Sequence, residues 1–65
     1  MKKVNAAELE PGQVIRVEYG DYGNWVDFTV DGAEETPKGV RVRCHNGRIE
    51  SVFVFEKDEA VEVKG

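Results

Sequence analysis

Hydrophobic and polar residues alternate along most of the chain after Gln13. Neighbouring side chains of a strand point to opposite faces, so this alternation predicts strands with one buried face. The pattern predicts five strands, at residues 14–19, 25–30, 40–45, 48–55 and 60–64. Before them, Asn5 is a suitable helix N-cap and Pro11-Gly12 ends the turn. We therefore expect at most a short N-terminal helix, with Leu9 as its contact to the core.

The spacing of turn residues predicts how the strands pair. Asn46-Gly47 is typical of a type I′ turn, which would place Cys44 opposite Ile49 and Arg43 opposite Glu50. Residues 31–39 are polar and contain Thr-Pro, so we expect a loop there, and the simplest register then places Phe28 opposite Val42. The side chains that this arrangement points inward form the predicted core: Ile15, Val17, Val26, Phe28, Val30, Val40, Val42, Cys44, Ile49, Phe53, Phe55, Val61 and Val63.

A chain of 65 residues has room for a single domain, residues 1–65, and five short antiparallel strands best protect their edges by closing into a barrel. We expect an all-β, five-stranded small barrel with one helical turn. Over most of the chain, the element order and lengths resemble Src-homology-3 type barrels and their Sm-like variant. The opening segment, residues 6–15, is similar to the start of short accessory proteins of actinobacterial phages and mobile elements.

Composition narrows the possible functions. The net charge of −4 disfavours nonspecific binding to nucleic acid or to an anionic membrane. The chain has one cysteine, no secretory signal pattern and no apolar run long enough to span a bilayer, so we expect a cytoplasmic protein. Cys44 and His45 are neighbours in a strand and point to opposite faces, so they cannot form a catalytic pair or share a metal ion. We expect no enzyme activity and no cofactor.

The charge is unevenly distributed. Residues 36–55 carry four basic and one acidic side chain, a net charge of +3, although the whole chain is acidic. The expected strand parity places Arg41, Arg43 and His45 on the outer face, with Trp25 opposite His45. An outward tryptophan is a common binding anchor, and it would lie beside a glycine-rich loop that carries Tyr22.

These residues support two hypotheses. The first is a non-catalytic module that binds a host or partner protein through the outer sheet, as an accessory or regulatory protein of a phage or mobile element would. Its contact residues are Trp25, Tyr22, Arg41, His45 and Arg48. The second is a single-stranded nucleic-acid binder, in which Arg41, Arg43 and Arg48 contact phosphates and Trp25 stacks on bases.

The same residues also have explanations in terms of stability alone. Asp27, Arg43 and Glu50 are expected to form a cross-strand charge ladder, and Trp25 to be either exposed or a cap on one end of the barrel. Val52 and Val54 fall on the outer face, where they form a partner interface or a contact between copies of the chain, or are covered by the N-terminal helix through Leu9. The last strand, 60–64, either closes the barrel or pairs with a second copy.

Overall fold

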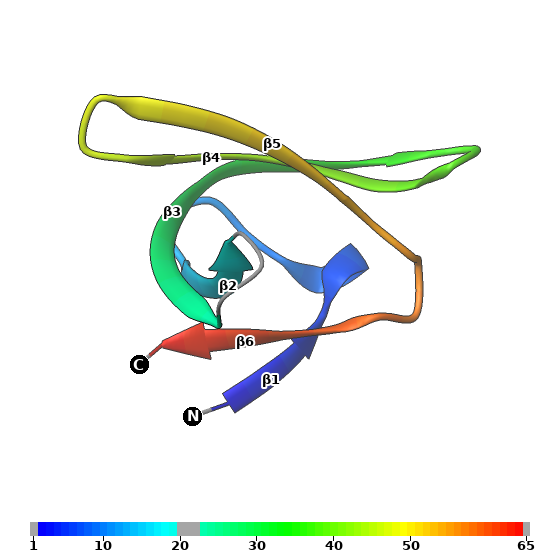
Figure 1. Cartoon of the computed structure of the whole chain (residues 1–65). Helices are drawn as coiled ribbons and strands as arrows, with labels where there is room; N and C mark the ends of the chain where they lie inside the picture. The colour runs from blue at the N-terminus through cyan, green and yellow to red at the C-terminus, as the bar shows by residue number, and fades with distance from the viewer. Residues whose placement is uncertain (1, 20–22, 65) are drawn as a thin grey trace.

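Figure 1 shows a computed structural model of the chain, which describes residues 2–19 and 23–64. The protein is all-β, with a single short 3-10 helix in the described part. Its elements are β1 (Lys2–Asn5), η1 (Ala6–Glu8), β2 (Val14–Tyr19), β3 (Asn24–Thr36), β4 (Gly39–Asn46), β5 (Ile49–Phe55) and β6 (Ala60–Lys64). No helix in these residues is long and apolar enough to cross a membrane.

The strands form one antiparallel sheet in the order β1-β6-β2-β3-β4-β5. The sheet has six strands, because residues 2–5, for which no strand was expected, pair with β6. Strands β1 and β5 are its two edges, and the described residues contain no ladder that joins them. The closed five-stranded barrel is therefore not what the structure has. The last strand, β6, lies between β1 and β2 of its own chain.

Strand β3 is shared by the two halves of the sheet. Its first part pairs with β2, with Phe28 opposite Ile15, and its second part pairs with β4. The register shifts between Val30 and Gly32, so Asp31 forms a bulge, which bends a strand and increases its twist. Figure 1 shows β3 curling from the β2 side over to β4. Most of the predicted 31–39 loop is therefore strand, and that prediction was wrong.

The bulge also changes which residues face each other. Val30 lies opposite Cys44 and Ala33 opposite Val42, so the predicted pairing of Phe28 with Val42 was wrong. The inward parity of the predicted residues in β3 and β4 was correct, since Phe28, Val30, Val42 and Cys44 are all buried. Parity follows from local alternation, whereas register depends on every residue between the two strands.

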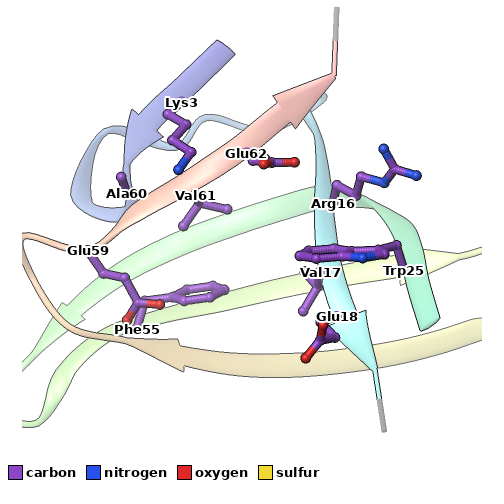
Figure 2. Close-up of a pocket in the computed structure, with 10 residues that line it drawn as sticks. All are labelled: Lys3, Arg16, Val17, Glu18, Trp25, Phe55, Glu59, Ala60, Val61 and Glu62. Atoms are coloured by element: carbon purple, nitrogen blue, oxygen red, sulfur yellow. The ribbon is translucent and has the colours of Figure 1, made fainter. Parts of the chain in front are cut away.

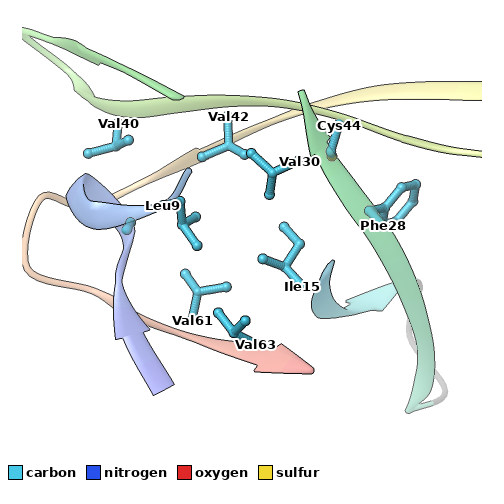
Figure 3. Close-up of a cluster of buried hydrophobic side chains, with 10 residues drawn as sticks. Leu9, Ile15, Phe28, Val30, Val40, Val42, Cys44, Val61 and Val63 are labelled. Atoms are coloured by element: carbon cyan, nitrogen blue, oxygen red, sulfur yellow. The ribbon is translucent and has the colours of Figure 1, made fainter. Parts of the chain in front are cut away.

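The core lies between the two halves of the sheet (Figure 3). Leu9 is buried in it, as expected. Asn5 is the N-cap of η1, and its side chain accepts a hydrogen bond from the Ala7 amide at 3.2 Å. The buried hydrophobic residues are Ala6, Leu9, Ile15, Phe28, Val30, Val40, Val42, Cys44, Val61 and Val63. Val17, Val26, Phe53 and Phe55 are partly buried against them, while Ile49 is 63% exposed. The placement of Ile49 in the core was wrong.

The turn between β4 and β5 explains the exposure of Ile49. Asn46 pairs with Ile49, so the two central turn residues are Gly47 and Arg48, one position later than expected. Gly47 has a φ of 59° and Arg48 does not have a positive φ, which is the pattern of a type II′ turn. Each partner therefore shifts by two residues: Cys44 faces Ser51 and His45 faces Glu50. A shift of two preserves the faces but moves Ile49 past the end of the core.

The opposite end of β4 is tightly packed against β5. Gly39 is buried and has a φ of 137°, in the region that favours glycine. A β-carbon there would overlap the carbonyl oxygen of Phe55 and lie 3.5 Å from Cγ1 of Val54. The close approach of these two backbones therefore requires glycine at this position.

Candidate interaction surfaces

Trp25 lies on the outer side of β3 and is 51% exposed, so it does not cap the core. It pairs with Glu18 of β2, and the guanidinium carbon of Arg16 lies 5.9 Å from the centroid of its ring. That distance is within the range of a cation–π contact. The ring is thus held from one side and remains accessible to a partner.

Trp25 borders a groove of about 250 Å³ (Figure 2). The groove exists because the β2–β6 ladder ends at the pair Arg16–Glu62, so the two strands separate beyond it. We call this the Trp25 groove; it is lined by Lys3, Arg16, Val17, Glu18, Trp25, Phe55, Glu59, Ala60, Val61 and Glu62. Two cations and three carboxylates surround aromatic and aliphatic side chains, so the groove offers contacts for charged and apolar groups together.

The structure separates Trp25 from the basic residues expected beside it. Arg41 and Arg43 are exposed and share the outer face of β4 with the half-exposed His45, as predicted, and Arg48 is exposed in the turn. However, the residue opposite His45 is Thr29, which lies four positions along β3 from Trp25. At about 3.4 Å per residue, that places Trp25 roughly 14 Å along the strand from Thr29. The predicted pairing of Trp25 with His45 was therefore wrong, and Tyr22 lies outside the described residues.

The predicted charge ladder is also absent from the described residues. The Asp27 carboxylate accepts a hydrogen bond from Nζ of Lys64 at 3.0 Å, and Arg43 faces Gly32 and Val52. A different pair forms at the bulge, where the Asp31 carboxylate lies 2.8 Å from Nδ1 of His45.

Cys44 is buried and faces the core. Burial raises the pKa of its thiol, and the nearby Asp31 carboxylate adds to that increase. The Sγ–H donates to the carbonyl oxygen of Ser51 at 3.5 Å. A raised pKa reduces the thiolate fraction at neutral pH, which makes this thiol a poor nucleophile. Residues 2–19 and 23–64 contain no group of three His, Cys, Asp or Glu side chains placed to hold a metal ion.

Strand β5 carries a second accessible surface. Val52 and Val54 are 49% and 61% exposed on the outer face, so the alternative that Leu9 and the N-terminal helix cover them was wrong. Ile49 is exposed at the start of the same strand. These three exposed aliphatic side chains all lie on an edge strand, Val52 and Val54 on its outer face and Ile49 on its inner face. The sequence pattern predicted that Val52 and Val54 face outward. It did not predict the exposure of Ile49, which depends on the position of the β4–β5 turn.

Comparison with known proteins gave no match to a family model, to a curated protein or to a solved structure.

Proposed function

We propose that the protein is a non-catalytic interaction module that holds a partner protein in the Trp25 groove. The observation that carries the proposal is the half-exposed Trp25 ring at the mouth of a groove lined by charges of both signs. An indole ring supplies a large contact area at a small cost in conformational entropy, and such residues often dominate binding energy. A polypeptide segment with an apolar side chain between polar neighbours matches this lining.

The fold relationship is part of the same proposal. We infer that the chain is a small barrel of the Src-homology-3 or Sm-like type, opened at one side and extended by β1. The order β6-β2-β3-β4-β5 supports it, because four consecutive strands form a meander and the last strand returns beside the first of them. A role as an accessory or regulatory protein of a phage or mobile element agrees with the similarity of residues 6–15 to a segment of such proteins.

The experiment is affinity capture from a lysate of the source cells with tagged protein, followed by titration of the partner that is retained. Trp25→Ala should abolish retention, and Trp25→Phe should restore part of it because an aromatic ring remains. Arg48→Ala, in the β4–β5 turn and outside the lining of the Trp25 groove, is the matched control and should retain the partner. Equal retention by Trp25→Ala and the wild type would refute the proposal.

A second candidate is single-stranded nucleic-acid binding by the outer face of β4. Its support is that Arg41, Arg43 and Arg48 are exposed and that none of them forms an ion pair within the described residues. Trp25 does not lie beside these arginines in the sheet, because it is four positions along β3 from Thr29, the residue opposite His45. This candidate predicts oligonucleotide binding that weakens steeply with salt and with Arg43→Ala. Absence of binding at low salt would eliminate it.

A further inference from the structure

We propose that the exposed edge of β5 pairs with β5 of a second copy of this chain, in an antiparallel, two-fold symmetric dimer centred on Val52. The first observation is where exposed apolar side chains are found. Four large hydrophobic residues are exposed in the described part of the chain, and three of them, Ile49, Val52 and Val54, lie on β5. Exposed aliphatic side chains that gather on one edge strand are typical of an interface.

The two edges of the sheet differ in how they are protected. β1 has four residues, two of which are the exposed Lys2 and Lys3, and a short, lysine-bearing strand discourages pairing with another chain. β5 has seven residues, Glu50 is its one charged residue, and it contains neither lysine nor proline. The edge of β5 therefore lacks the features that usually prevent pairing with another chain. Such features are not needed on an edge that is covered by a second strand in the assembled protein.

The backbone of β5 has the correct orientation for pairing. The two-residue turn makes Asn46–Ile49 a hydrogen-bonded pair, and such pairs alternate along an antiparallel ladder. Ser51, Phe53 and Phe55 therefore direct their amide and carbonyl groups to β4. Glu50, Val52 and Val54 direct theirs to the free edge. A second strand can take up these groups without disturbing β4.

One register uses the whole strand. When the two-fold axis passes through Val52, Val52 lies opposite Val52 of the second copy and Glu50 lies opposite Val54 of the second copy. The residues paired in this way are the ones whose backbone groups point to the free edge. On the inner face, the same register places the exposed Ile49 beside the half-buried Phe55 of the second copy. All seven residues of β5 are then paired.

Charge complementarity favours a second copy as the partner. Val54 lies opposite Arg41 in the β4–β5 ladder, so Glu50, Val54 of the second copy and Arg41 of the second copy form a row across three strands. The Cα atoms of Glu50 and of Arg41 of the second copy are then separated by two strand spacings, roughly 10 Å, which these two long side chains can span. Within one chain, Arg41 lies opposite Val54, which is four positions along β5 from Glu50. The side chains of Arg41 and Glu50 therefore meet only across the interface.

Sedimentation equilibrium over a range of concentrations tests the dimer, which has twice the 7.3 kDa mass of one chain. Val52→Lys places two ammonium groups directly opposite each other and should weaken dimerisation by about tenfold or more. Ala33→Lys is the matched control, because it adds the same charge at an exposed position away from β5 and should leave dimerisation unchanged. Thermal melts confirm that both variants fold.

Charge reversal tests the register. Glu50→Arg and Arg41→Glu should each weaken the dimer, and the double variant should recover most of the lost affinity. Arg41 also faces Glu34 in its own chain, so Arg41→Glu is expected to lower monomer stability, which the double variant does not restore. Recovery of dimerisation without recovery of the melting temperature therefore identifies the contact between chains.

Amide exchange provides an independent test. As the protein concentration rises, the amides of Glu50, Val52 and Val54 should become protected, while those of Ser51 and Phe53 are protected throughout. A protein that stays monomeric up to its solubility limit would overturn the proposal. So would association that Val52→Lys leaves unchanged, or protection that appears on β1 in place of β5.

Discussion

Replacing Gly39 with alanine is expected to destabilise the protein by about 3 kcal/mol. A residue with a side chain loses about 1–2 kcal/mol at a positive φ, and Gly39 has a φ of 137°. The new methyl group would also overlap the carbonyl oxygen of Phe55 and lie 3.3 Å from its carbonyl carbon. The Val40–Phe55 end of the β4–β5 ladder must therefore move, and such overpacking typically costs about 1–3 kcal/mol.

That loss is large for this chain. At about 0.05–0.15 kcal/mol per residue, a domain of this size has a free energy of unfolding of about 3–10 kcal/mol. In a domain this small, each kcal/mol lowers the melting temperature by about 4–8 °C, so we expect a decrease of about 15 °C. Urea and thermal melts followed by the fluorescence of Trp25 measure both quantities.

Gly12→Ala is the matched control. Gly12 also has a positive φ, 93°, but a β-carbon there meets no atom within 4 Å. The control should cost about 1–2 kcal/mol from the backbone alone. If the two variants differ by less than about 0.5 kcal/mol, the overlap with Phe55 does not limit this position and the reasoning is wrong.

Three further predictions concern the core and the ionisable groups. Val42→Ala removes two methyl groups at a fully buried position and should cost about 2–3 kcal/mol in urea unfolding; a cost below about 1 kcal/mol would contradict the packing described. Because the pKa of Cys44 is raised above the ordinary 9.0, its contribution to stability is fully present below that pH and is lost as the pH rises. Cys44→Ala should therefore show a smaller fall in stability above pH 9.0 than the wild type, and parallel alkaline curves would refute this. Asp27→Asn removes an exposed ion pair with Lys64 and should change the unfolding free energy by less than about 1 kcal/mol, with a larger change pointing to a buried network.

The sequence predicted which side of each strand is buried, because alternation is a local property. Val26, Phe28 and Val30 face inward in β3, as Val40, Val42 and Cys44 do in β4. A single inserted residue at Asp31 was not visible in the pattern, because aspartate and glycine favour turns and residues 31–39 were therefore assigned to a loop. Because the residues after it were assigned to a loop, the predicted register of β3 and β4 was wrong.

The error in the candidate site follows from that register. The sequence identified Trp25 and the arginines of β4 as outward-facing, which the structure confirms for Trp25, Arg41 and Arg43. Their separation depends on pairings across the bulge. The Trp25 groove depends on where the pairing of β2 with β6 ends. That pairing is between residues about 45 positions apart in the sequence. No local pattern indicates such a contact.

The position of β6 has a consequence for how the chain assembles during synthesis. Strands β2 to β5 pair with their neighbours in the chain, so this meander can form from short-range contacts as it leaves the ribosome. Its core remains uncovered until Val61 and Val63 arrive, because β6 inserts between β1 and β2. Ile15, fully buried in the folded structure, lacks its neighbour Val63 until then. Completion of the fold therefore waits for the last strand to clear the exit tunnel.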